Sequence, residues 1–268
     1  MKALPRINSN YWLALVAASI FGTNTGDYLS DYLHLGHVVG LPYLLAALAG
    51  IFFLEKISPW ATALYFWAAI IVIRTAATNV ADATHDIGIY GIGAVIALFV
   101  GFYYAVRFYK TKVDANPGDP TTPRVDGFYW LVMALAGIVG TLAGDLSSMG
   151  LGFGAYFISH LTGWTTEAFS FDWMTKGHVI ATLIYGTGIL AMLRRYSFAE
   201  LAKPYQYWTM LALIRTAGTA MGDYISKTSL GLQGATLVDG AIFIGLVFFF
   251  YVFKNDNQAR NAALVAAE

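Results

Sequence analysis

The chain has 268 residues, of which 57% are hydrophobic and only 12% are charged, and its formal net charge is zero. Soluble domains are roughly 25% charged, so this composition indicates a polytopic membrane protein. Zero net charge argues against nucleic acid as a partner. The chain has no cysteine, which excludes disulfides, thiolate metal sites and cysteine nucleophiles.

The first apolar segment begins near residue 7 and is predicted to be a retained membrane span, because no small-residue cleavage pattern follows it. It contains the motif GTNTGD, which begins at Gly22. The same pattern, small-Thr-x-x-small-Asp, returns as ATNVAD at Ala77, GTLAGD at Gly140 and GTAMGD at Gly218. Fifteen residues before each aspartate stands a tryptophan that follows an aromatic residue: Tyr11–Trp12, Phe66–Trp67, Tyr129–Trp130 and Tyr207–Trp208. Four ungapped matches indicate an internal repeat.

Each repeat continues, after a short glycine-containing turn, into a second apolar run, at about residues 38–54, 89–106, 178–193 and 234–253. Each run is close to the ~20 residues that a bilayer requires. The predicted fold is therefore a single all-α membrane domain (1–268), a helix bundle with eight transmembrane helices. Its parts are repeat 1 (7–55), repeat 2 (60–107), a cytoplasmic linker (108–126), repeat 3 (127–195) with an outer insertion (155–176), repeat 4 (204–254) and a cytoplasmic tail (255–268).

The repeats are of two types. Repeats 1 and 3 share GHV followed by an aliphatic residue (Gly36–Val39 and Gly177–Ile180), whereas repeats 2 and 4 share IRTA (Ile73–Ala76 and Ile214–Ala217). The order is therefore A-B-A′-B′. Because each repeat crosses the membrane twice, all four run parallel, which predicts a pseudo-fourfold arrangement about an axis along the membrane normal.

Basic residues predict the sidedness. Lys176 and Lys227 fall on one side of the predicted spans, and the other side, which bears both termini, holds Lys2, Arg6, Lys56, Arg107, Lys110, Lys112, Arg124, Arg194, Arg195, Lys203, Lys254 and Arg260. The positive-inside rule then predicts that both termini are cytoplasmic. The four repeat tryptophans are expected at the cytoplasmic interface, where aromatic rings collect.

These repeats resemble those of a family of bacterial integral membrane proteins that are built of four tandem copies of a repeat of unknown function. The resemblance rests on the small-Thr-x-x-small-Asp and aromatic-Trp columns and covers nearly the whole chain. It implies a multi-pass protein of the bacterial inner membrane. It supplies no substrate and no site residues.

The repeat aspartates are the main candidates for function, since a charge within a span is costly. Threonine and aspartate four residues apart share a helix face, so the first helices are expected to turn both toward a common axis. The predicted ion- or proton-binding residues are Asp27, Asp82, Asp145 and Asp223 with Thr23, Thr78, Thr141 and Thr219. The alternative is that these aspartates lie in the outer headgroup layer or cap the following turns.

Two arginines lie within the predicted spans. Arg74 and Arg215 precede Asp82 and Asp223 by eight residues, and helical side chains lean toward the N-terminus. Both arginines are therefore expected to point away from their own aspartates, in a deeper layer. They serve there either as gating and counter-charge groups, together with Asp239, or as partners in interhelical hydrogen bonds to carbonyls or hydroxyls.

All five histidines fall on the predicted outer side, close to carboxylates such as Glu167 and Asp172. Histidine and carboxylate ligands suit divalent metals such as Zn or Mn. The predicted metal ligands are His37, His178, His85, Asp31 and Asp86. His37 and His178 stand at equivalent positions in the two halves, so a twofold relation is expected to bring them together.

The favoured function is transport of a small cation, such as a divalent metal ion, or of a proton-coupled solute, through an acidic site in the outer half of the bundle. The chain has no nucleophile or cofactor motif, so no enzyme is expected. The expected partners are membrane lipids and the small ion or solute. Two alternatives stay open: a haem- or metal-binding redox protein that uses His37 and His178, and a sensor or assembly factor without transport. The insertion at 155–176 is either an interfacial segment or a lid.

Overall fold

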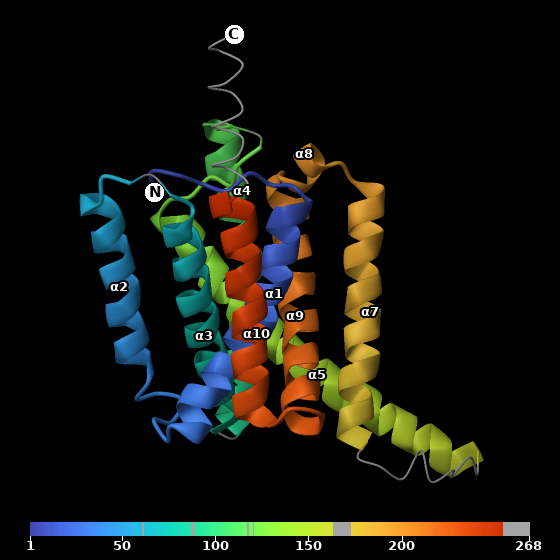
Figure 1. Ribbon diagram of the computed structural model, residues 1–268. Helices are drawn as coiled ribbons and strands as arrows, with labels where there is room; N and C mark the ends of the chain where they lie inside the picture. Colours follow the sequence, from blue (N-terminus) through green and yellow to red (C-terminus); the bar gives the residue numbers. More distant parts are fainter. Residues whose placement is uncertain (61, 87–88, 117, 120, 163–172, 254–268) are drawn as a thin grey trace.

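A computed structural model gives the fold and describes residues 1–60, 62–86, 89–116, 118–119, 121–162 and 173–253 (Figure 1). These residues form helices α1 (Ser9–Asp27), α2 (Leu41–Ile57), α3 (Leu64–Asp86), α4 (Ile89–Ala115), α5 (Gly127–Thr162), α7 (Trp173–Arg195), α8 (Phe198–Leu201), α9 (Pro204–Thr228) and α10 (Gly231–Phe248), with π-helical turns η1 (Tyr28–Tyr32) and η2 (Phe249–Phe253). The prediction of an all-helical fold is thus confirmed for the described part of the chain.

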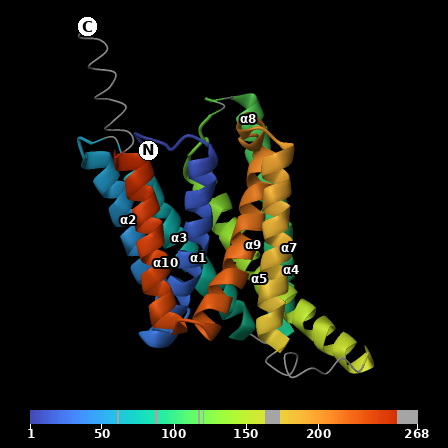
Figure 2. The same ribbon diagram turned by 45° about the vertical axis from the view of Figure 1, so that its right-hand side comes forward.

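Four helices form the interior of the bundle. Helix α1 packs on α3, α3 on α5, α5 on α9, and α9 on α1, so that these helices close a ring. The remaining long helices lie outside it: α2 packs on α3, α4 on α5, α7 on α5 and α9, and α10 on α1 and α9 (Figures 1 and 2). The second helix of each predicted repeat therefore packs against the first helix of the next repeat around the ring, where repeat 1 follows repeat 4, and α7 and α10 also pack on the first helix of their own repeat.

Five helices are long and apolar enough to cross a membrane, with candidate spans Leu64–Thr84, Gly91–Ala115, Gly127–Ser159, Thr175–Arg195 and Gly231–Val252 among the described residues. This agrees with a membrane protein. The inner helices α1 and α9 do not reach the same average hydropathy, because they turn polar side chains such as Thr23, Asn24 and Thr219 into the protein. Helix α2 has only 17 residues, although it buries none of them.

The bundle has two chemically distinct ends. One end, here called the linker end, carries the N-terminal segment, α8 and the connection between α4 and α5, and it lies at the top of Figure 1. The N-terminal segment is tied to it by Lys2, whose Nζ donates to the carbonyls of Lys56 at 2.9 Å and Ser58 at 2.6 Å. The opposite end, here called the aspartate end, carries η1 and the turn between α9 and α10, where Gly231 has a φ of +67°.

Two predicted boundaries are wrong. Helix α4 continues to Ala115, so the first part of the predicted linker at 108–126 is helical. Helix α5 continues to Thr162, so residues 155–162 of the predicted insertion extend that helix. This extension slants out beyond α7 (Figure 1) and exposes large apolar side chains such as Phe157 and Leu161. Residues 163–172, which include Glu167 and Asp172, lie outside the described residues.

Glycines let the inner helices approach one another closely. A Cβ atom on Gly22 of α1 would collide with the Arg74 side chain of α3, and one on Gly140 of α5 would collide with Arg215 of α9. A Cβ on Gly218 of α9 would collide with Ser19 of α1. Each of these glycines opens a small-Thr-x-x-small-Asp motif, so the motif glycines are explained by helix packing.

Asp126 caps the start of the inner helix α5 and ties it to the end of α4. Its Oδ1 accepts from the backbone N–H of Tyr129 at 2.8 Å, and its Oδ2 accepts from Lys112 Nζ at 2.7 Å. Burial would raise the pKa of Asp126, but the hydrogen bonds from Lys112 and Tyr129 outweigh it, so the pKa lies below its usual value. Asn8 caps α1 in the same way, with its side chain accepting from the Tyr11 N–H at 3.0 Å.

Asp126→Ala is expected to lower the free energy of unfolding by about 1 kcal/mol, because the N-cap is lost. The carboxylate has a lowered pKa in the folded protein, so its contribution is present at neutral pH and is lost as the pH falls through that pKa. Unfolding of the purified protein in detergent, measured at several pH values, checks this. A difference between the wild type and Asp126→Ala that stays constant into acid would contradict the role of the ionised carboxylate.

Candidate functional site

One arginine side chain lies at the centre of the inner ring of helices. Arg74 is fully buried, and its guanidinium donates to the hydroxyls of the repeat threonines on all of the inner helices. Its Nη1 donates to Thr78 at 3.0 Å and Thr141 at 2.6 Å, and its Nη2 donates to Thr23 at 2.5 Å and Thr219 at 2.8 Å. These four threonines are here called the threonine ring. The structure thus gives Arg74 interhelical hydrogen bonds to hydroxyls.

Each hydroxyl of the threonine ring is also engaged by its own helix. Each donates to the backbone carbonyl four residues earlier, at distances of 2.9 Å for Thr23, 3.3 Å for Thr78, 3.2 Å for Thr141 and 3.1 Å for Thr219. The hydroxyls therefore face a guanidinium, and a cation would be repelled from them. The prediction that they supply oxygen ligands to an ion does not fit this arrangement.

The direction of Arg74 also differs from the prediction. Its guanidinium reaches Thr78, four residues toward the C-terminus, and so approaches the aspartate end. The side chain goes against the usual lean of helical residues because four acceptors converge there, whereas an unpartnered buried charge is costly.

The second arginine has no such set of acceptors. Arg215 is also fully buried, and its Nη2 contacts Met133 Sδ at 3.5 Å. Its Nε and Nη1 find no hydrogen-bond partner among the described residues. The groups that act on its charge most strongly are Arg74 and the tyrosines 207, 129 and 11. Arg215 thus lies on the linker side of Arg74, as predicted for a deeper layer.

The aromatic residues that precede the repeat tryptophans form a second closed ring, here called the aromatic ring. The side-chain centroids of adjacent members are separated by 6.2 Å for Tyr11 and Phe66, 6.4 Å for Phe66 and Tyr129, 6.3 Å for Tyr129 and Tyr207, and 6.4 Å for Tyr207 and Tyr11. The Tyr207 hydroxyl lies 2.5 Å from that of Tyr11 and 2.7 Å from that of Tyr129. From the sequence, the aromatic residue before each repeat tryptophan served only to mark the repeat, and the hydroxyl contacts were not predicted. The tyrosine at three of the four positions could have indicated them.

The repeat tryptophans pack around the aromatic ring. Trp12, Trp67 and Trp208 are 2%, 1% and 1% exposed, and Trp130 packs between Phe52 and Phe66. The prediction that these side chains face the membrane interface is therefore wrong. The rings instead bury their apolar area between neighbouring inner helices.

The repeat aspartates lie at the aspartate end, beyond the threonine ring. Asp82 and Asp223 act electrostatically on both Asp27 and Asp145, which are half-buried. Asp82 lies 3.9 Å from His37 Nδ1, and Asp223 lies 3.8 Å from His178 Nε2. Asp223 also accepts from Lys227 Nζ at 2.9 Å. The four carboxylates thus share one end of the bundle with basic partners.

The two histidines do not form the predicted pair with each other. His37 lies against the aspartate of repeat 2 and His178 against that of repeat 4, so each histidine serves its own half of the chain. The geometric reason is that the second helix of a repeat packs on the first helix of the next repeat. This arrangement does not support a haem bound between His37 and His178.

The remaining predicted site residues are scattered. Asp239 lies on α10 and accepts from Asn24 Nδ2 at 2.7 Å, which ties α10 to α1. Asp31 is exposed on η1 and accepts from Ser30 Oγ at 2.9 Å. The side chains of His85 and Asp86, in the last turn of α3, lie outside the described residues.

Where side chains are described, no group of three or more His, Cys, Asp or Glu residues is placed to hold a metal ion. The predicted metal ligands therefore do not form a ready-made site among the described residues. Metal binding at this end would need ligands that move together.

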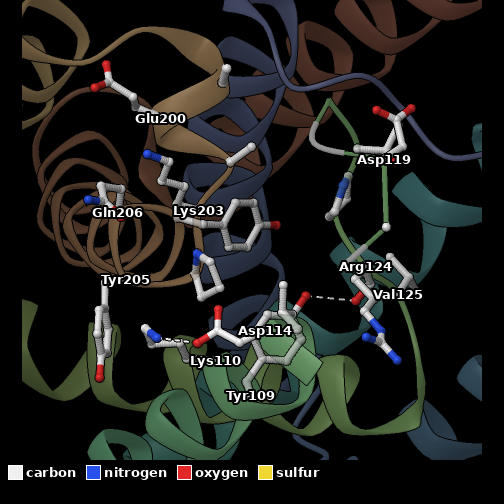
Figure 3. Close-up of a pocket in the computed structure, with 18 of the residues that line it drawn as sticks. Tyr109, Lys110, Asp114, Asp119, Arg124, Val125, Glu200, Lys203, Tyr205 and Gln206 are labelled. Carbon is white, nitrogen blue, oxygen red and sulfur yellow. Dashed lines mark hydrogen bonds and ion pairs between the residues drawn. The ribbon is translucent and has the colours of Figure 1, made fainter. Parts of the chain in front are cut away.

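A pocket of about 960 Å³ opens at the linker end. Figure 3 shows Lys110, Asp114 and Arg124 on one side of it and Glu200 and Lys203 on the other. Its lining also includes Tyr207, the central member of the tyrosine hydroxyl contacts. The pocket thus reaches the aromatic ring from the linker end.

The described residues thus form an all-helical bundle with several helices long and apolar enough to cross a membrane and a polar axis inside its inner ring. Residues 10–58 and 206–256 each match a family model described as a Repeat of Unknown Function (DUF347). These stretches correspond to predicted repeats 1 and 4, one of each type, so types A and B are versions of the same repeat. No curated protein and no solved structure matches the chain.

Proposed function

We propose that the chain is a membrane transporter of a small cation or a proton-coupled solute, and that Asp27, Asp82, Asp145 and Asp223 form its ion- or proton-binding site. The main observation in support of the proposal is the order of charged side chains along the axis of the bundle. Carboxylates gather at the aspartate end, and directly behind them one guanidinium closes the inner ring through four hydroxyls.

The proposed topology is that of eight spans in a pseudo-fourfold A-B-A′-B′ bundle in the bacterial inner membrane. The linker end carries most of the basic residues, so the positive-inside rule supports a cytoplasmic linker end with both termini on that side. The aspartates then face the outside. An ion from outside would meet the carboxylates first and the buried arginines second.

The axis supports a carrier rather than an open channel. A cation that passed the aspartates would meet Arg74 and then Arg215, and fixed positive charges in a pore reject cations. Arg74 therefore acts as a closed gate on the linker side of the acidic site. Opening it requires the threonine ring to release the guanidinium, which is a movement of the inner helices.

Proton coupling is favoured over a resident metal by the two histidine–aspartate contacts. Each contact joins an imidazole, which can take up or release a proton, to a carboxylate. A proton that binds at such a contact changes the charge of the acidic site by one unit. This gives a means of coupling protonation to release of a bound cation.

Flux in proteoliposomes tests the proposal. The full chain is reconstituted with a pH-sensitive dye inside, and proton movement and uptake of radioactive manganese are followed under an imposed pH gradient. The wild type is expected to move at least one of them. A variant with Asn at positions 27, 82, 145 and 223 is expected to lose that flux, because the neutral amides bind neither proton nor cation.

Asp119→Asn is the matched control, since Asp119 is an exposed carboxylate at the linker end. It is expected to retain the flux of the wild type. Full flux in the fourfold Asn variant would remove the aspartates from the mechanism. The absence of proton and manganese flux in the wild type would favour a sensor or assembly factor instead.

A further inference from the structure

Arg215 is a buried charge that lacks acceptors. Its side chain is 0% exposed, and two of its three guanidinium nitrogens have no partner among the described residues. The third contacts a thioether sulfur, which is a weak acceptor. An arginine keeps its proton in proteins, so a full positive charge lies inside the bundle. Such a charge is costly unless a counter-charge or acceptor accompanies it.

Arg74 provides the comparison within the same molecule. The two arginines occupy the same position in the shared IRTA sequence, yet Arg74 takes all the hydroxyls of the threonine ring. These hydroxyls are therefore not available to Arg215. The charge of Arg74 also acts on Arg215 from the aspartate side, which raises the need for a negative group on the linker side.

The tyrosines on that side add a further donor. Tyr11, Tyr129 and Tyr207 carry three hydroxyl protons, and the two contacts between their oxygens use two of them. One proton is left to point elsewhere, and all three side chains are buried. The described residues thus give no acceptor to Nε and Nη1 of Arg215, and none to the remaining tyrosine hydroxyl proton.

We propose that Arg215 and the tyrosine hydroxyls bind a small monovalent anion of the size of chloride. An anion accepts from several donors at once and neutralises the guanidinium, whereas a water molecule supplies an acceptor but no charge. A halide is the smallest of the common monovalent anions, so it requires the least displacement of the side chains around the buried guanidinium. The pocket at the linker end (Figure 3) touches Tyr207 and gives the anion a route from that side.

Halide-dependent stability tests this site. The full chain is purified in detergent with sodium gluconate in place of all chloride, and its thermal unfolding is followed as chloride or bromide replaces gluconate at constant ionic strength. A saturable rise of the unfolding temperature is expected for the wild type. It is expected to be lost in Arg215→Gln and retained in Arg107→Gln, since Arg107 stacks over Tyr103 on α4.

Tyr207→Phe keeps the test decisive if Arg215→Gln does not fold. It removes one hydroxyl and leaves the guanidinium in place, so the half-saturating chloride concentration is expected to rise about tenfold. Bromide in crystals of the wild type is expected to give an anomalous peak beside Arg215. A wild type that responds equally to gluconate and halide would overturn the site, as would an unchanged halide response in Arg215→Gln or in Tyr207→Phe.

Discussion

Replacing Arg74 by lysine is expected to destabilise the bundle by about 3 kcal/mol, more than replacement by methionine. A lysine ammonium has three donors at one point, whereas the guanidinium of Arg74 reaches four hydroxyls through two separate nitrogens. Lysine therefore keeps the buried charge and loses part of its hydrogen bonding. Methionine removes the charge, and each threonine still donates to its own helix, so a loss of about 1–2 kcal/mol is expected.

Unfolding in mixed detergent and denaturant micelles measures both variants against the wild type. Arg107→Lys is the control, because Arg107 is exposed on the outer helix α4. It is expected to leave the unfolding free energy within experimental error. If lysine at position 74 were tolerated better than methionine, the positive charge rather than the forked geometry would be what the threonine ring requires.

Gly140→Ala is expected to lower the free energy of unfolding by about 1–3 kcal/mol, which is the usual range for overpacking of a dense interior. The added Cβ would collide with Arg215 Cβ and lie only 3.1 Å and 3.2 Å from the backbone C and Cα of the same residue. Backbone atoms cannot rotate aside, so α5 and α9 must move apart. That movement would also disturb the threonine ring, to which both helices contribute.

Gly101→Ala serves as the matched control in the same experiment. Gly101 is a helical glycine on α4, and a Cβ added there would meet no atom of the described residues within 4 Å. Alanine there is expected to be neutral or to stabilise by about 0.5–1 kcal/mol, because it lowers the entropy of the unfolded chain. Equal effects at positions 140 and 101 would show that helix propensity, not close packing, governs the motif glycines.

Sequence periodicity predicted which helices lie inside. The small-Thr-x-x-small-Asp motif occurs once on each of α1, α3, α5 and α9, and these are the helices that close the inner ring. A shared motif places the same face of each helix toward a common axis, so the convergence of the threonines follows from spacing alone. The role of the glycines in close helix packing follows in the same way.

The partner of each polar group did not follow from spacing. Both arginines have the same sequence context, yet Arg74 turns toward the threonine ring and Arg215 toward Met133. Which arginine contacts the threonine ring depends on the number of acceptors that lie on the bundle axis, and this number is a property of the assembled bundle. Likewise, His37 contacts Asp82 because α2 packs on α3, the first helix of the next repeat. The sequence does not show that a second helix packs on the next repeat.

The threonine ring has places for a single guanidinium, although the chain supplies two at equivalent positions. The reverse assignment, with Arg215 among the threonines, would use the same hydroxyls after a half-turn about the bundle axis. The two positions differ in one neighbour: Met133 gives Arg215 a sulfur contact on the neighbouring helix, whereas the matching position beside Arg74 is Leu15, which has no acceptor atom. The interior of this internally repeated chain is thus asymmetric, and its two halves are not interchangeable.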